Sequence, residues 1–272
     1  MAPINNTRIL RAKYATDHAL TIDNFKQDTA QLDTTLQAGE ILVSTLNQVI
    51  TGFGLGEVIE SKDPDFPRGA IVLGSNLPWE SDRLGDARNP KIPICAYLNV
   101  LGVTGLTAWA AVDTIVKKFK KDQIVYISSA PGIWGNLQWD PVGTFFAILA
   151  KCEGAFMVGC AGSDDKVQYF LENIGLDACF NYKTQDARAE LAKAAPQGLD
   201  IHIDLVGNET LDIALEKIKD NGLVVVVGNF ESAAGKAEYV FKNMMQIIFK
   251  ALRVEGFAVF QHLHRYPDFG PM

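Results

Sequence analysis

Residues that bind metal ions are scarce in this sequence of 272 residues. It contains four cysteines and four histidines, and residues 1–94 hold no cysteine and only the histidine His18. A catalytic zinc ion is held mainly by Cys and His side chains, and a structural zinc ion needs a tight cluster of cysteines. Neither pattern is present, so the sequence predicts no metal site and argues against a zinc-dependent enzyme.

The few cysteines also bear on the compartment in which the protein works. They lie far apart, at Cys95, Cys152, Cys160 and Cys179. Two of them, Cys152 and Cys160, fall inside apolar segments, so we expect buried thiols in a reducing compartment. The N-terminal stretch MAPINNTRILRAKY has no apolar core of signal-peptide length, and no later run is long enough to span a membrane. These observations predict a cytoplasmic protein with no membrane partner.

Positive charge is also in short supply. The chain has 25 Lys and Arg residues against 32 Asp and Glu residues, which gives a net charge of −7. No cluster of basic residues stands out from this balance. Nucleic acids and anionic membrane surfaces attract basic patches, so neither is an expected partner. The remaining class of partner is a small molecule.

Apolar residues, in contrast, are plentiful enough for a large core. They make up 48% of the chain, and its length fits one large domain or two modest ones. Residues 1–100 are predicted to be β-rich, with strands separated by Asp, Pro and Gly. These strands are expected at residues 9–14, 40–46, 54–60 and 70–73.

From residue 101 onward, helical and strand patterns alternate. Near-continuous apolar strands that alternate with amphipathic helices indicate an α/β fold, in which a parallel sheet is covered on both faces. Strands are expected at residues 124–127, 155–160, 178–180, 201–206, 223–228 and 254–260. Helices are expected at residues 142–150, 167–173, 187–195, 211–219 and 242–252.

The segment of residues 123–166 has the β-turn-α-β pattern of a pyrophosphate-binding unit, in which a glycine-bearing turn meets a helix N-terminus. Its glycines do not form one clean G-x-G-x-x-G motif, so two alternatives remain open. The phosphate loop is either residues 130–135, which include Gly132, or an SSAPG turn joined to Pro141, Val142 and Gly143 around an insert at residues 133–140. We favour the second because residue 142 leads directly into an apolar helix.

The end of the second strand indicates which nucleotide would bind. An NAD site usually has an acidic residue there, which bonds the ribose 2′-hydroxyl. This chain instead has Ala161, Gly162 and Ser163, followed by two acids and Lys166. Small residues leave room for a 2′-phosphate, and Lys166 could supply its counter-charge. We therefore predict NADP(H) rather than NAD(H), although the acids at 164 and 165 could instead cap the next helix.

Several blocks of sequence carry a family resemblance in their order and spacing. They are LGVTGLTAWAAVD, CAGSDDKVQYF, GLDACFNYKTQD, GLDIHIDLVGNETLD, LVVVVGNF and KNMMQIIFKALRVEGFAVF. The chain resembles the medium-chain dehydrogenase/reductase superfamily. Within it, the chain is similar to the zinc-independent NADPH-dependent alkenal/one and prostaglandin reductases, which are leukotriene B4 dehydrogenase-like and related to quinone oxidoreductases.

The resemblance implies a fold and an activity. The expected fold is a GroES-like domain over residues 1–100 followed by a Rossmann NADP-binding domain, a doubly wound parallel sheet, over residues 101–272. The expected activity is NADPH-dependent reduction of the C=C bond of an enone or enal, in members that often serve fungal secondary metabolism. The substrate would be a small molecule, and the resemblance allows a homodimer.

The resemblance also implies roles for individual residues. Lys166 would meet the 2′-phosphate, Tyr182 would pack beside it, and Thr107 would contact the cofactor from a helix start. The nicotinamide half would be lined by two stretches, Val227, Gly228, Asn229 and Phe230 in the first and Phe257, Ala258 and Val259 in the second. No catalytic acid can be assigned, and His202 is predicted to be a core or strand-end residue.

The chain departs from the family pattern in several places. Leu205 stands where relatives carry an Asn that touches the cofactor, and a block that relatives carry near residues 49–54 is absent. Together with the insert at residues 133–140 and the early end at Met272, these departures predict a shortened first domain and a C-terminally incomplete second one. They predict a poor catalyst, and they keep open an alternative: a diverged or truncated nucleotide-binding protein without turnover.

Overall fold

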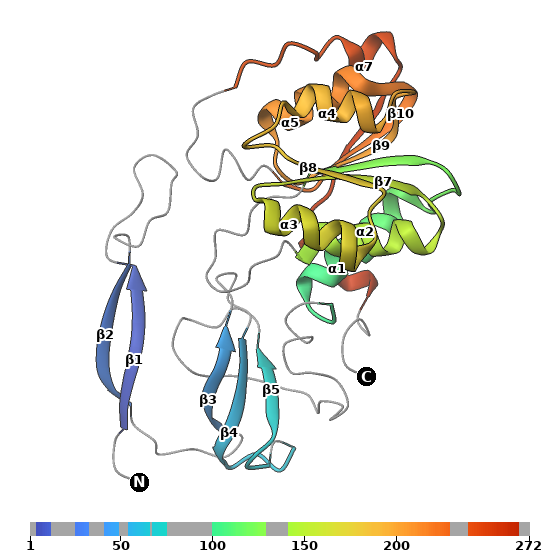
Figure 1. The fold of residues 1–272 in the computed structure, drawn as a ribbon. Coiled ribbons are helices and arrows are strands. Elements are labelled where there is room, and N and C mark those ends of the chain that lie inside the picture. The colour runs from blue at the N-terminus through green and yellow to red at the C-terminus, as the bar shows by residue number, and fades with distance from the viewer. Residues whose placement is uncertain are drawn as a thin grey trace. The chain divides into compact units, whose positions relative to one another are not determined.

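The chain forms two compact units in the computed structural model, Met1–Val103 with Pro267–Met272, and Thr104–Tyr266. Figure 1 shows the elements of each unit as ribbons. The structure describes residues 4–11, 25–32, 41–48, 54–65, 67–74, 100–128, 141–228 and 239–266.

The described part of the first unit consists of antiparallel strands. β1 (Ile4–Arg11) pairs with β2 (Phe25–Leu32), and β4 (Gly54–Ser61) lies between β3 (Ile41–Gln48) and β5 (Ile71–Gly74). The prediction that this region is β-rich is confirmed. The sequence of β2, FKQDTAQL, mixes charged and amide residues with few apolar ones, so it gave no strand signal.

The turn between β4 and β5 follows from its local chemistry. The Asp63 carboxylate accepts a hydrogen bond from the Asp65 N–H at 3.0 Å, which is the Asx-turn geometry that favours a reversal. Gly69 has a φ of 84°, in the left-handed region that glycine adopts most easily. The Val58 N–H donates to the Ala70 carbonyl at 2.9 Å. This hydrogen bond joins β4 to the residue that directly precedes β5.

The second unit is built on a six-stranded sheet in the order β11-β10-β9-β6-β7-β8. All of its pairings are parallel. Counted along the chain, this is the strand order 3-2-1-4-5-6 of the doubly wound dinucleotide-binding fold, so the predicted fold class is confirmed. The strands are β6 (Ile124–Ser128), β7 (Phe156–Ala161), β8 (Ala178–Asn181), β9 (Leu199–Asp204), β10 (Ile218–Val226) and β11 (Arg253–Gly256).

Helices cover both faces of this sheet. Figure 1 shows α1, α2 and α3 on one face and α4, α5 and α7 on the other. Short π-helical turns extend α1 and α3 at residues 112–116 and 170–174. The helices are α1 (Val103–Ala111), α2 (Pro141–Cys152), α3 (Asp164–Tyr169), α4 (Ala187–Ala194), α5 (Asn208–Lys217) and α7 (Gln246–Phe249).

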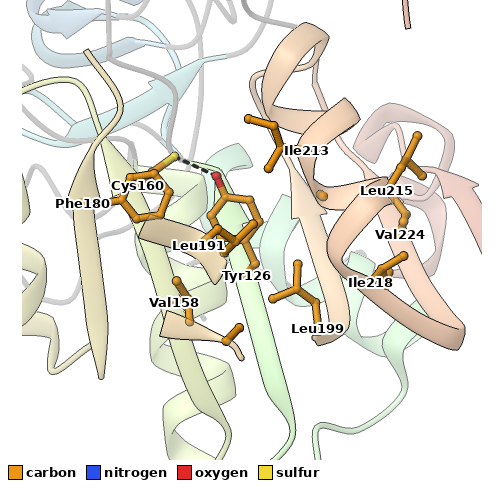
Figure 2. Close-up of a cluster of buried hydrophobic side chains, with 12 residues drawn as sticks. Tyr126, Val158, Cys160, Phe180, Leu191, Leu199, Ile213, Leu215, Ile218 and Val224 are labelled. Atoms are coloured by element: carbon orange, nitrogen blue, oxygen red, sulfur yellow. Dashed lines mark hydrogen bonds between the residues drawn. The ribbon is translucent and has the colours of Figure 1, made fainter. Parts of the chain in front are cut away.

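A cluster of buried side chains joins the sheet to α4 and α5 (Figure 2). Tyr126 and Val158 contribute from the strands, Leu191 from α4, and Ile213 and Leu215 from α5. Strands that are buried on both faces need apolar residues at successive positions rather than alternating ones. This is why β6, β7, β9 and β10 could be predicted from their continuous apolar runs.

Three local predictions are wrong. The helix expected at residues 242–252 is limited to α7, because the N–H groups of Lys242 and Asn243 bind the Asp212 carboxylate instead of starting a helix, and Ala251 has a φ of 48°. The strand expected at 254–260 ends at Gly256 and gives way to a short 3-10 helix, Val259–Gln261. Cys152 is exposed, because it is the last residue of α2.

Candidate nucleotide-binding site

The carboxyl ends of the parallel strands meet at one edge of the sheet. In doubly wound folds, ligands bind at this edge, where the strand order reverses. Here the reversal lies between β6 and β9, which are neighbours although β7 and β8 separate them in sequence. The residues that follow β6, β7, β8, β9 and β10 are therefore the candidates for a site.

The helix that follows β6 begins where the favoured alternative placed it. α2 starts at Pro141, and proline suits the first helical position because its missing N–H would have no partner inside the helix. Val142 is half-buried and Gly143 is buried in the same turn, while Phe146 and Ala147 pack into the core. Gly132 and the insert at residues 133–140 lie outside the described residues, so the contact of this turn with a pyrophosphate stays a prediction.

A buried hydroxyl ties the end of β6 to the end of β9. The Ser128 Oγ lies 3.1 Å from Asp204 Oδ1, to which it donates. It also accepts hydrogen bonds from the N–H groups of Leu205 at 2.9 Å and Val206 at 3.3 Å. The same Asp204 oxygen accepts from the Gly207 N–H at 3.1 Å. This network fixes the turn after β9 at the edge of the sheet, and the sequence gave no sign of Ser128.

His202 is a core residue, as predicted. It is fully buried, and its ring stacks on the Tyr126 ring with centroids 4.9 Å apart. Its Nδ1 lies 3.2 Å from the Tyr126 carbonyl oxygen, which can only accept, so Nδ1 carries a proton. Its Nε2 is 3.4 Å from Asp204 Oδ1. Among the described residues, His202 Nε2 and Asp204 Oδ2 are the buried side-chain atoms without a hydrogen-bond partner.

Tyr126 has no polar role at the edge itself. Its hydroxyl lies inside the core and donates to Cys160 Sγ at 3.2 Å (Figure 2). Burial, followed by the nearby Cys160, raises the pKa of Tyr126 well above its ordinary value. Because the hydroxyl is enclosed in the core and bonded to Cys160, it cannot reach a ligand and is not a candidate proton donor.

The ends of β7 and β8 form the part of the edge that would select the nucleotide. The Tyr182 N–H donates to the Ala161 carbonyl at 3.1 Å, so the turn after β8 lies beside the turn after β7. A Cβ atom on Gly162 would lie only 2.9 Å from the Tyr182 hydroxyl oxygen. The Tyr182 side chain thus packs directly on a residue that has no side chain of its own, and the structure brings these two predicted features together.

The acids after Gly162 do not cap the next helix. The N-cap position of α3 is Ser163, and Asp164 and Asp165 lie in the first turn. The Asp164 carboxylate accepts a hydrogen bond from the Asn181 amide at 2.6 Å, so it holds the turn after β7 against the end of β8. Lys166 is half-buried in α3.

The residues predicted to line the nicotinamide half follow β10 and β11. The N–H groups of Val227 and Gly228 both lie near the Asp204 carbonyl, at 2.8 and 3.2 Å. The Phe257 N–H donates to the Val226 carbonyl at 2.8 Å, and the buried Phe257 ring stacks on His262 at a centroid distance of 4.9 Å. The structure therefore brings these two stretches to neighbouring strand ends.

The other residues predicted to contact the cofactor either lie away from the strand ends or fall outside the described residues. Ala258 is exposed and Val259 is buried in the 3-10 helix. Thr107 is buried in the middle of α1. Asn229 and Phe230 lie outside the described residues.

Within the described ranges, no three His, Cys, Asp or Glu side chains gather closely enough to hold a metal ion. In the same ranges, no helix is both long and apolar enough to cross a bilayer.

The strand order of the sheet and the glycine at the end of β7 define the class of this unit, a doubly wound dinucleotide-binding fold.

Comparison with known proteins identifies the family. Residues 141–271 match the family described as zinc-binding dehydrogenase. The chain is 36% identical over 233 residues to the NADP(+)-dependent 2-alkenal reductase of Nicotiana tabacum, covering 81% of this chain and 64% of that protein. It is 32% identical over 249 residues to (+)-pulegone reductase of Mentha piperita, covering 86% of this chain and 70% of that one. The chain belongs to the medium-chain dehydrogenase/reductase family.

A solved structure shares the fold. The crystal structure of CurA in complex with NADPH, from Vibrio vulnificus, superposes with a TM-score of 0.79 at 23% sequence identity. The match covers 97% of this chain and 85% of CurA. The chain spans about two thirds of the length of the tobacco and peppermint relatives.

Proposed function

We propose that the protein is an NADPH-dependent oxidoreductase that reduces the C=C bond of an enone or enal. The observation that carries this proposal is the end of β7, where Gly162 stands in place of the acidic residue typical of NAD sites. Because Gly162 has no side chain, the Tyr182 hydroxyl can pack against the end of β7, which brings a polar group to the place where a 2′-phosphate would bind. The substrate class is supported by the tobacco and peppermint relatives, which are named as alkenal and pulegone reductases.

Different residues at this edge would bind different parts of the cofactor. The first turn of α2, with Pro141, Val142 and Gly143, would hold the pyrophosphate, because backbone N–H groups and the positive end of the helix dipole at a helix N-terminus favour an anion. Lys166 and Tyr182 would bind the 2′-phosphate. When bound, NADPH supplies the hydride that adds to the β-carbon of the alkene, and a proton completes the reduction at the α-carbon.

The nicotinamide half would lie against the ends of β10 and β11. The residues proposed to line it are Val227, Gly228, Asn229, Phe230, Phe257, Ala258 and Val259, with Thr107 contacting the cofactor from α1. The Ser128 and Asp204 network would hold the neighbouring turn in place, because it ties the backbone of Leu205 and Val206 to β6. A fixed turn orients the cofactor against the alkene without a cost of reorganisation during the reaction.

The proposal extends to organisation and location. We place a GroES-like domain in residues 1–100 and the NADP-binding Rossmann domain in residues 101–272. We further propose a cytoplasmic protein that forms a homodimer. The dimer is supported by β11, which pairs only with β10 among the described strands and therefore offers a sheet edge to a second copy.

The activity test compares two substrates with one cofactor. NADPH consumption would be followed by absorbance with an α,β-unsaturated aldehyde and, as the matched control, with the saturated aldehyde of the same length. A C=C reductase consumes NADPH with the first and not with the second. Equal rates with both aldehydes would indicate carbonyl reduction instead and would contradict the proposal.

One observation favours a second candidate, a nucleotide-binding protein without turnover. Leu205 occupies the position where the family resemblance expects an Asn, and its side chain is buried. An apolar side chain cannot supply the amide hydrogen bond to a cofactor. This candidate predicts that NADPH raises the thermal unfolding temperature of the protein while no unsaturated aldehyde or ketone causes NADPH consumption.

A further inference from the structure

A second lysine lies at the position where the 2′-phosphate is expected. A Cβ atom on Gly162 would be 3.2 Å from Lys183 Cε and 2.9 Å from the Tyr182 hydroxyl oxygen. The Lys183 side chain therefore lies across the end of β7 next to the tyrosine, with its ammonium one bond beyond Cε. The sequence pointed only to Lys166, because nothing in the order of residues shows that Lys183 crosses back to β7.

The turn that carries Lys183 is held by a buried amide. Asn181 is 4% exposed, and its Oδ1 accepts a hydrogen bond from the Lys183 N–H at 3.1 Å. Its own N–H donates to the Gln185 side chain at 2.8 Å, and its Nδ2 donates to Asp164. Because these hydrogen bonds hold Asn181 in place, they also fix the backbone of Lys183, whose side chain extends toward Gly162.

The charge of Lys183 is available to a ligand. Among the described residues, no carboxylate lies within ion-pair distance of its ammonium. The Asp164 carboxylate is bonded to the Asn181 amide, which directs one of its oxygens toward β8. An exposed lysine with no ion-pair partner keeps its full charge for an incoming anion.

We propose that Lys183 is a specificity-determining residue that binds the 2′-phosphate of NADPH together with Lys166 and Tyr182. The proposal rests on the cofactor assignment above and adds a residue to it. Lys166 lies on α3, which starts two residues after Gly162, whereas Lys183 comes from the turn after β8. A phosphate at this position would receive cationic contacts from two separate elements, which a ribose hydroxyl cannot use.

The test measures dissociation constants for NADPH and NADH with the unmutated chain, Lys183→Ala, Lys183→Arg and a control, Lys120→Ala. Lys120 is exposed and precedes β6, at the opposite edge of the sheet, so its removal changes the net charge equally. We expect Lys183→Ala to weaken NADPH binding by about three- to tenfold, the range for a partly solvated charge contact. NADH binding should be unchanged, and Lys183→Arg should retain most of the preference for NADPH.

The adenosine half can be tested alone with 2′,5′-ADP and 5′-AMP as competing ligands. Lys183→Ala should lose affinity for 2′,5′-ADP and keep its affinity for 5′-AMP, with circular dichroism confirming that the variant is folded. If the unmutated chain prefers NADPH and Lys183→Ala prefers it equally, the role of Lys183 is refuted while the cofactor assignment stands. If the unmutated chain binds both dinucleotides equally or neither, the cofactor assignment itself fails, and this inference fails with it.

Discussion

Replacing Gly162 by aspartate should reverse the nucleotide preference. The substitution places a carboxylate at the end of β7, where NAD-binding proteins carry an acidic residue for the ribose hydroxyls. Gly162 has no positive φ, so its backbone accepts a side chain without strain. The new Cβ would lie 2.9 Å from the Tyr182 hydroxyl and 3.2 Å from Lys183 Cε, and both are far ends of side chains that can move aside.

The magnitude follows from Coulomb's law. Two unit charges about 5 Å apart interact with about 1 to 3 kcal/mol, depending on how much water screens them. At a half-exposed position, we expect Gly162→Asp to weaken NADPH binding by roughly tenfold or more. A hydrogen bond from the ribose hydroxyl to the carboxylate should strengthen NADH binding by about 1 kcal/mol, or roughly fivefold.

The assay is a fluorescence titration of NADPH and NADH at two salt concentrations, with Gly162→Ala as the matched control. Alanine displaces Tyr182 in the same way but adds no charge, so it measures how much NADPH binding is lost when Tyr182 alone moves. The additional loss with aspartate then measures the effect of the carboxylate. High salt should reduce the effect of aspartate, because screening shortens the range of its repulsion. The reasoning is refuted if Gly162→Asp and Gly162→Ala show the same ratio of NADPH to NADH affinity.

Other substitutions test the neighbouring residues. Lys166→Ala should lower the preference for NADPH by more than tenfold, as expected for a charge-assisted contact; an unchanged ratio of dissociation constants would remove Lys166 from the site. Ser128→Ala leaves the Leu205 N–H without its buried partner and should cost about 1 to 3 kcal/mol in urea unfolding, with an unchanged midpoint as the contrary result. Burial raises the pKa of Cys179 to about 12, so at pH 8.5 its thiol stays protonated. An alkylating reagent should then modify the exposed Cys152 first, and mass spectrometry showing the reverse order would contradict the structure.

The parallel sheet could be predicted from the sequence because burial on both faces leaves a continuous apolar run. β7 and β9 are strands of this kind. The strand β2 could not be predicted, because its sequence FKQDTAQL is mostly polar and shows no alternation. The length of α7 could not be predicted from its local sequence either. It is limited by Asp212, which is distant in sequence and binds the N–H groups of Lys242 and Asn243.

The candidate site was predictable to the extent that its residues lie near one another in sequence. Gly162 and Lys166 follow one strand, so their joint role could be inferred from spacing. Ser128 and Asp204 are 76 residues apart, and Lys183 meets Gly162 only because β7 and β8 are neighbours in the sheet. Such roles depend on which strands pair, and the strand order becomes visible only in the folded chain.

We propose that this sheet edge binds NADPH for the reduction of a C=C bond. The most direct measurement is to incubate the protein with an α,β-unsaturated aldehyde and NADPH deuterated at C4, and to locate the deuterium in the product by NMR. The proposed function predicts a saturated aldehyde with deuterium on its β-carbon. Deuterium at C1 of an allylic alcohol, or no transfer in a protein that binds NADPH, would contradict it.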